Sequence, residues 1–512
     1  MRVYRGIKAY RLFLQAYQHI LWKQCRSLIR EKGFPAELWT VVRDLWSLRL
    51  SKLLHKLEDP LDGTGTESQG VPSGVDNQDQ SDGQTSSAKR KLATGSPTLL
   101  DTICLCYMAI LLLRVPTSLC QILRWIHQED VPYIRAIRHV PAEMKGKLPG
   151  EYHEALDTST VLRPEALQLG VSDLCAMYDR SYGLSIAPLN WPPMLYQYIE
   201  RLSLPLEVYP VAKQLNDIVA FDFMFTNSGE RRRKAISYPE AQLMCLVVVA
   251  TKLLFPFNSN AVKRNPREAS EPAILSIDWS AWVDGREGRS AAEKVNDSLQ
   301  NGMEINVKDK DIFDMSSQQL DQYMDWYQRT WVKLDTADDE VNKELLDMFP
   351  LKEIAGKSVD RGSALREDEA AFELIKHMHA NLKMNQIITD EQAEEIEGEV
   401  IRPGMQYQQF RDLENLSLSR VASLFYREAA ELSCLSIDSL LRAVLQSERK
   451  ITLWRRAKRR AETFGEAMDL EAEEALPLGL EGLGQMTLAE AAVDEAGLSD
   501  SDNSDSNMKM NE

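Results

Sequence analysis

Runs of lysine and arginine are the residues of this chain best suited to bind a ligand. Arg231, Arg232, Arg233 and Lys234 are consecutive in SGERRRKAISYPEAQ, directly before a strongly apolar segment. Four adjacent cations on a loop can contact the phosphates of a nucleic acid, and each counterion that they displace makes the binding salt-dependent. The same run could instead be a solubilising loop or a nuclear-import signal.

A second run, RKITLWRRAKRR at residues 449–460, contains seven basic residues and no acidic residue. Trp454 lies among these cations, where it could stack on a base or simply pin its helix to a neighbouring one. We interpret both runs as candidate contacts with the DNA backbone, and we assign base reading to no residue. The candidates in this second run are Arg455, Arg456, Lys458, Arg459 and Arg460.

Catalytic and metal-binding motifs do not assemble in the sequence. The segment AGKS at residues 355–358 resembles the end of a phosphate-binding loop, but Leu351 stands where that motif requires glycine. His377 and His379 are two residues apart on a predicted helix, so they cannot share one face as metal ligands. None of the seven cysteines forms a CxxC pair, which favours reduced, buried thiols. We therefore predict a binding protein rather than an enzyme, with no catalytic residue and no metal site.

Charge is distributed unevenly along the 512 residues, whose formal net charge is −17. Residues 1–57 carry 12 Lys and Arg against 3 Asp and Glu, a net charge of +9, whereas residues 461–512 carry 14 acidic residues against one lysine. Without the −13 of that C-terminal segment, the rest of the chain has a net charge of only −4. Its basic patches suit a polyanionic partner, although they could also be solvated helix faces.

The most apolar segment is SYPEAQLMCLVVVATKLLFPF, residues 237–257. Its apolar run is about 15 residues long, shorter than the roughly 20 that span a bilayer. Lys252 lies within the run, and a lysine near the centre of a membrane span costs a few kcal/mol. We therefore predict a buried core helix here and no membrane segment.

The spacing of apolar residues predicts two sets of five helices. The first set comprises residues 1–30, a segment around Leu45 to Leu53, and residues 99–114, 117–127 and 132–139. The second set comprises residues 192–202, 206–221, 238–255, 278–284 and 318–334. The third helix of each set is the most apolar and is therefore expected to be central. These two central helices are about 138 residues apart, which suggests an internal repeat.

The predicted architecture is all-α, because no segment alternates strongly enough to propose a sheet. Residues 59–98, rich in Gly, Ser, Asp and Gln and without an aromatic residue, are predicted to be a disordered insertion. Residues 461–512 are predicted to be a disordered acidic tail, in which LSDSDNSDS offers serines beside aspartates for phosphorylation. The expected domains are a first fold at 1–140, a connector at 141–188, a second fold with loop insertions at 189–335, a helical region at 340–460 and the tail.

Several blocks of the sequence resemble a known family. The chain is similar to the transcription factor IIB-related subunit of the RNA polymerase I core factor in fungi, the counterpart of a TBP-associated factor of RNA polymerase I in animals. The blocks span about residues 1–335 and comprise MRVYRGIKAYRLFLQAYQHILWKQCRSLI, VVRDLWSLRL, VPYIRAIRHVP, LNWPPMLYQYIERLSLPLEVYPVAKQL, SYPEAQLMCLVVVATKLLFPF, IDWSAWV and LDQYMDWYQRTWV.

The resemblance implies two tandem cyclin-like folds of five helices each, in agreement with the helix count. It also implies a nuclear and nucleolar initiation factor that contacts the ribosomal DNA promoter, TATA-binding protein, RNA polymerase I and other core-factor subunits. Family members carry an N-terminal zinc ribbon before the first cyclin-like fold, whereas Met1 of this sequence begins at that fold and no cysteine cluster is present. Either the ribbon belongs to a missing upstream exon or this variant lacks it. We therefore expect no zinc in this chain. A cyclin-type regulatory subunit of a protein kinase, built on the same fold, is the alternative.

Overall fold

The computed structural model describes residues 3–58, 96–158, 161–225, 235–257, 264–295, 299, 304, 307–331, 372–373, 375–380, 382–396 and 399–472. The chain divides into two units, Met1–Ile451 and Thr452–Glu512. Within the described ranges, the only strands are β1 (Leu275–Ser276) and β2 (Lys383–Met384), which pair antiparallel. The all-α prediction is therefore confirmed.

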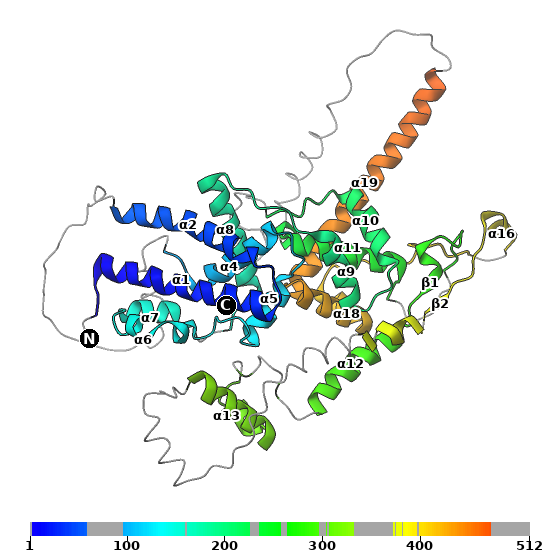
Figure 1. Ribbon diagram of the computed structural model, residues 1–512. Helices are drawn as coiled ribbons and strands as arrows, with labels where there is room; N and C mark the ends of the chain where they lie inside the picture. The colour runs from blue at the N-terminus through cyan, green and yellow to red at the C-terminus, as the bar shows by residue number, and fades with distance from the viewer. Residues whose placement is uncertain are drawn as a thin grey trace, which may run out of the picture. The chain divides into compact units, whose positions relative to one another are not determined.

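The first bundle forms around α4 (Leu99–Leu112), the predicted third helix (Figure 1). Thr98 and Asp101 form a capping box that starts this helix by satisfying its first free backbone amides. Eleven of its residues are buried, so α4 is apolar on all sides, as expected for a helix surrounded by others. Its neighbours include α1 (Gly6–Glu31) and α2 (Glu37–Glu58).

The region after α4 differs from the predicted helices. The expected helix at 117–127 is present as α5 (Leu119–His127), but the one at 132–139 is only a single 3₁₀ turn, η1 (Ala136–His139). Arg135 adopts a left-handed conformation, with φ of 48°, and this breaks the helix before it can form. Two short helices follow, α6 (Ala142–Lys145) and α7 (Gly150–Leu156).

The expected connector at 141–188 contains a long helix, α8 (Pro164–Tyr182), that completes the first bundle. It packs along α4 and α5. Gly170 permits the close approach, because a Cβ atom at this position would lie 2.9 Å from Leu100 Cδ2 and 3.1 Å from Cys104 Sγ. The buried hydroxyl of Tyr178 donates a hydrogen bond to the Leu45 carbonyl of α2, at 2.7 Å. Residues 164–182 are thus part of a core and not a linker.

The second bundle forms around α11 (Pro239–Leu254), where every residue except Leu253 is buried. The prediction of a buried core helix in this segment is confirmed. Helices α9 (Trp191–Arg201) and α10 (Val208–Val219) pack against it. The short turn η2 (Ala235–Ser237) leads into α11.

The other helices of the second bundle differ from those expected. The segments predicted as its fourth and fifth helices lie in α12 (Trp279–Val295) and α13 (Ser317–Trp331). Helix α18 (Arg420–Leu432) contacts both α11 and α12, and Glu448 of α19 (Ile437–Ala472) contacts Lys252 of α11. The expected separate helical region at 340–460 therefore contributes α18 and the first part of α19 to this core.

Helix α13 contacts the first bundle. The indole Nε1 of Trp326 donates a hydrogen bond to Glu129 Oε1, at 3.1 Å, and the guanidinium of Arg135 lies 4.4 Å from the ring centre of Trp331. The smaller elements are η3 (Pro272–Ile274), η5 (Asp311–Asp314), α16 (Asp390–Glu395) and α17 (Leu413–Ser417).

Two predicted disordered segments lie largely outside the described residues, namely 59–95 of the insertion and 473–512 of the tail. The tail prediction was wrong at its start, because α19 continues as a helix to Ala472. Half of residues 461–472 are Ala or Glu, which are good helix formers, so the preceding helix continues through them.

Candidate nucleic-acid interface

The first predicted site, Arg231, Arg232, Arg233 and Lys234, lies outside the described residues. The structure resumes at η2, directly after Lys234, and leads into the N-terminus of α11. The assignment of these four cations to the DNA backbone therefore stays a prediction.

The second predicted site lies on α19, in the unit that begins at Thr452. All five candidate cations are exposed to solvent: Arg455, Arg456, Lys458, Arg459 and Arg460. At about 100° per residue, the four arginines fall within an arc of about 140° on the helix, so they form one arginine face. Lys458 lies outside that arc, where its Nζ is 5.4 Å from the ring centre of Trp454 and 3.9 Å from Glu462 Oε1.

A third basic surface, which the sequence analysis did not assign as a site, runs along α1. We call it the basic stripe. At about 100° per residue its members fall within an arc of about 120°, and at 1.5 Å per residue they extend over about 35 Å. Residues 3–30 include no Asp or Glu, so no acidic residue of the helix interrupts the stripe before its end. Its members are exposed or partly exposed and comprise Arg5, Lys8, Arg11, Lys23, Arg26 and Arg30.

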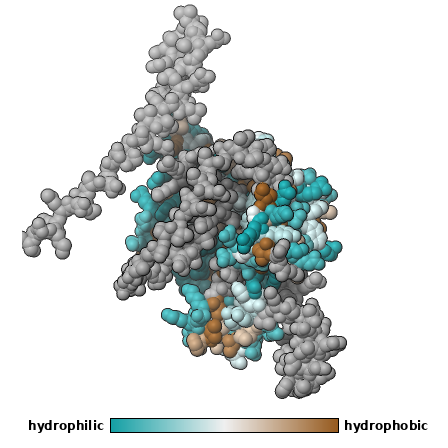
Figure 2. All heavy atoms as spheres, turned by 90° about the vertical axis from the view of Figure 1, so that its left-hand side faces the viewer, coloured by the Kyte–Doolittle hydropathy of each residue, from teal (hydrophilic) through white to brown (hydrophobic). Residues whose placement is uncertain are grey.

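An aromatic residue lies within the basic stripe. The Lys23 ammonium and the Arg26 guanidinium are each 5.3 Å from the ring centre of Trp22, and the His19 ring centre is 5.7 Å from the same ring. A cation held against an aromatic face keeps its charge near the surface while part of its side chain is buried. On the side of the molecule that Figure 2 shows, many of the described surface residues are hydrophilic.

Two histidines, His19 of α1 and His139 of η1, have lowered pKa values. Burial, followed by the charges of Arg138, Lys23 and Lys145, lowers the pKa of His139 to about 4. Burial and then Lys23 lower the pKa of His19. Burial is the larger cause for both imidazoles, and the neighbouring cations add to it, so both rings favour the neutral form.

The basic stripe has the dimensions and the charge of a surface that follows a phosphate backbone. A length of about 35 Å matches roughly ten base pairs of B-form DNA, since each strand carries one phosphate per 3.4 Å. Such contacts give affinity and orientation but do not distinguish sequences. The stripe could have been found in the sequence from the helical spacing of its cations, had their angular positions been compared.

The cysteines of the chain do not fit a zinc ribbon. Cys104 and Cys106 are both buried in the core of the first bundle, and no two of the seven cysteines have CxxC spacing. In the described part of the chain, no group of three or more His, Cys, Asp or Glu residues is arranged to bind a metal ion. Likewise, none of the helices described here combines the length and apolar character that a bilayer span requires.

Two models of one protein family match this chain in tandem. The "Rrn7/TAF1B, N-terminal cyclin domain" matches residues 17–142, and the "Rrn7/TAF1B, C-terminal cyclin domain" matches residues 160–331. The chain belongs to the Rrn7/TAF1B family. The prediction of two tandem cyclin folds is thereby confirmed, and so is the resemblance on which it partly rested.

Individual members of the Rrn7/TAF1B family are similar to this chain over parts of their length. The RNA polymerase I-specific transcription initiation factor rrn7 of Schizosaccharomyces pombe is 25% identical over 66% of this chain and 66% of its own length. A human TATA box-binding protein-associated factor of RNA polymerase I is 24% identical over 48% of this chain and 36% of its own length. The chain thus spans about one third to two thirds of the curated relatives that it matches. The yeast relative is named as a transcription initiation factor and the human one as a TATA box-binding protein-associated factor, and neither is named as an enzyme.

A solved structure has the same fold. A chain in the crystal structure of the Saccharomyces cerevisiae core factor superposes with a TM-score of 0.52 at 16% sequence identity. The match covers 87% of this chain and 98% of that one.

Proposed function

We propose that this chain is a general initiation factor for RNA polymerase I that acts in the nucleus and nucleolus. It helps to assemble the pre-initiation complex on the ribosomal DNA core promoter. The observation that carries this proposal is the ordered match of two Rrn7/TAF1B cyclin domains. It is supported by relatives named RNA polymerase I-specific initiation factors in yeasts and TATA box-binding protein-associated factors of RNA polymerase I in animals.

The protein's role in this assembly is that of a rigid helical platform. The two bundles share one hydrophobic core, and basic side chains lie on their surface. The basic stripe, the arginine face of α19 and the run at 231–234 would hold the DNA backbone in register, while other faces bind proteins. The protein partners that we propose are TATA-binding protein, RNA polymerase I and the other subunits of a core factor. Relatives named TATA box-binding protein-associated factors and the similar core-factor chain support this set.

Affinity purification combined with promoter occupancy tests the proposal. The tagged chain, expressed at its natural level, should co-purify with RNA polymerase I subunits and TATA-binding protein, and chromatin immunoprecipitation should place it at the ribosomal DNA promoter. Its depletion should lower synthesis of the ribosomal RNA precursor. Co-purification with a protein-kinase catalytic subunit, without promoter occupancy, would instead favour the cyclin-type regulator.

A further inference from the structure

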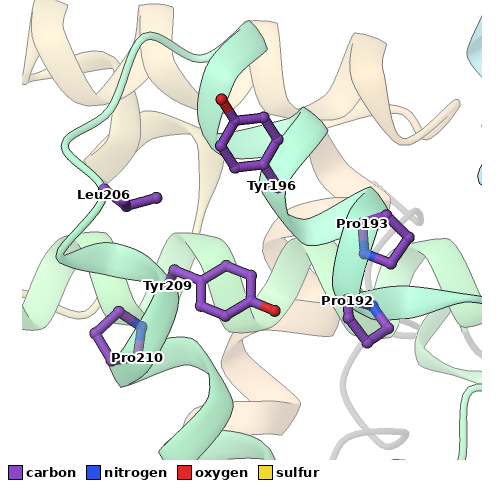
Figure 3. Close-up of a pocket in the computed structure, with 6 residues that line it drawn as sticks. All are labelled: Pro192, Pro193, Tyr196, Leu206, Tyr209 and Pro210. Atoms are coloured by element: carbon purple, nitrogen blue, oxygen red, sulfur yellow. The ribbon is translucent and has the colours of Figure 1, made fainter.

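An apolar groove lies on the surface of the second bundle, between α9 and α10. It is shallow and open, with a volume of about 580 Å³. Figure 3 shows the rings of Tyr196 and Tyr209 facing the space between the two helices, with prolines at the N-terminal end of α9 and beside Tyr209. The lining residues are Pro192, Pro193, Tyr196, Leu206, Tyr209 and Pro210.

The groove exposes apolar side chains that a monomeric surface would ordinarily bury. Tyr196 is 51% exposed and Leu206 is 54% exposed. Neither tyrosine hydroxyl has a hydrogen-bond partner among the residues that the structure describes. Two aromatic faces and two hydroxyl donors are thus available to a ligand in the same groove.

The walls of the groove are firmly supported from below. On α9, Met194, Leu195 and Tyr198 are buried, and on α10 the buried residues include Val208 and Ala212. Pro192 and Pro193 occupy the first turn of α9, where their fixed backbone angle favours the helix. The groove therefore exists before a ligand arrives, which reduces the entropy lost on binding.

The two ends of the groove differ in charge. Glu200 lies one turn after Tyr196 on α9, and Glu207 follows Leu206 in the chain, so both carboxylates lie at the end near the α9–α10 loop. Lys213 lies one turn after Tyr209, toward the opposite end. None of these three side chains forms an ion pair with another described residue. The acidic end is therefore complementary to a basic residue of a ligand.

We propose that this groove binds an extended, proline-containing segment of a partner protein, with a basic residue of that segment placed beside Glu200 and Glu207. Grooves lined by aromatic rings bind such segments because a polyproline II helix is extended before it binds and presents its prolines to the rings. The tyrosine hydroxyls would donate hydrogen bonds to the peptide carbonyls, which proline leaves without an intramolecular partner. The inference is independent of the surfaces proposed for DNA.

Fluorescence polarisation with the full-length chain tests this proposal. The probe is a fluorescein-labelled dodecapeptide with proline at two positions three residues apart and two arginines at one end. Saturable binding is expected, and Tyr209→Ala and Leu206→Lys should each weaken it at least about tenfold, as loss of a central aromatic or apolar contact does. Replacing both prolines of the peptide by alanine should weaken it similarly.

Charge reversal supplies a test that loss of folding cannot imitate. The double variant Glu200→Lys/Glu207→Lys should weaken binding of the arginine peptide and strengthen binding of the same peptide with glutamates in place of the arginines. Leu418→Lys, at a leucine that is 85% exposed and remote in sequence from the groove, is the matched control and should bind like the unaltered chain.

Two results would overturn the proposal. The first is an absence of saturable binding by either peptide at millimolar concentration, or binding that Tyr209→Ala leaves unchanged. The second is a concentration-dependent dimer, detected by analytical ultracentrifugation, that Leu206→Lys abolishes, because the groove would then be an interface between two copies of this chain.

Discussion

The ammonium of Lys252 lies 2.5 Å from Glu448 Oε1 and joins α11 to α19 inside the second bundle. Both side chains are buried, at 2% and 4% exposure, and the Lys252 ammonium also lies 4.6 Å from the ring centre of Tyr407. Burial lowers the pKa of Lys252, while the attraction of Glu448 opposes that effect. The lysine that argued against a membrane segment in the sequence thus has a carboxylate partner 196 residues away.

Removal of one partner of this pair should be far more costly than removal of both. Glu448→Ala leaves a buried ammonium without a counter-charge and should lower the free energy of unfolding by about 3 to 5 kcal/mol. The double variant Lys252→Met/Glu448→Leu replaces both charged side chains by apolar ones of similar volume. Its free energy of unfolding should be much closer to that of the unaltered chain. Urea denaturation of the three proteins measures this, and equal destabilisation by the single and double variants would contradict it.

Glu240 should make stability depend on pH. Its buried carboxylate accepts hydrogen bonds from Tyr107 and Tyr198 and from the Leu119 amide, and thereby connects the two bundles. Burial nevertheless raises the pKa of Glu240 to about 7 from a usual value of 4.5. Between pH 4.5 and 7 the folded state therefore holds a proton that the unfolded state has lost. The stability that this proton adds to the folded state is full below pH 4.5 and is lost as the pH rises through 7.

The expected size of this effect is about 3 kcal/mol between pH 4.5 and 7.5, because each pKa unit corresponds to about 1.4 kcal/mol. In Glu240→Gln that part of the pH dependence should disappear. The other titratable groups near Glu240 are the phenols of Tyr107 and Tyr198 and the thiols of Cys120 and Cys434. They are unchanged in Glu240→Gln, so any pH dependence of stability that they cause would persist in that variant. Urea denaturation across this pH range measures the effect. If the free energy of unfolding of Glu240→Gln changes with pH as it does in the unaltered chain, Glu240 is not the group responsible.

The basic stripe should contribute to the salt dependence of DNA binding. Lys23→Ala/Arg26→Ala/Arg30→Ala should weaken binding to promoter DNA and to unrelated DNA alike. The slope of log affinity against log salt should fall by about 2 to 3, since each lost phosphate contact contributes about 0.9. Fluorescence anisotropy from 50 to 200 mM salt provides the measurement. Arg43→Ala, at an exposed arginine of α2 that pairs with the adjacent Asp44, serves as the control and should leave the slope unchanged.

The two predicted cation sites can be separated by the same titration. Alanine at Arg455, Arg456, Arg459 and Arg460 removes the arginine face of α19 without altering its buried residues. Alanine at 231–234 removes the cations of the first predicted site. Each set should weaken promoter binding and flatten its salt dependence. A set whose replacement leaves affinity unchanged at every salt concentration does not contact DNA.

Deletion of residues 473–512 should raise non-specific DNA affinity at low salt. This segment contains ten acidic residues and one lysine, so it can shield basic surfaces from nucleic acid. The gain should vanish near physiological salt, where screening weakens the competition. Equal affinity of the shortened and full-length chains at 50 mM salt would exclude such shielding.

The apolar helices could be predicted from the sequence, and their partners could not. The run around α11 and the periodicity of α1 are local patterns, so both helices were placed correctly. The contribution of α18 and α19 to the second core depends on contacts such as that of Lys252 with Glu448, which join residues far apart in the chain. Helix α8 was missed because its apolar residues are interspersed with polar ones that are themselves buried. Gln168, for example, donates a hydrogen bond to the Ser433 carbonyl.

The position of α8 determines where the chain can be truncated to give a folded N-terminal domain. The family models meet between residues 142 and 160, a natural place to cut the chain into its two repeats. A cut there would strip α8 from α4 and leave Leu100 and Cys104 facing water instead of Gly170. The first repeat alone would therefore aggregate, and a soluble N-terminal half has to extend past Tyr182.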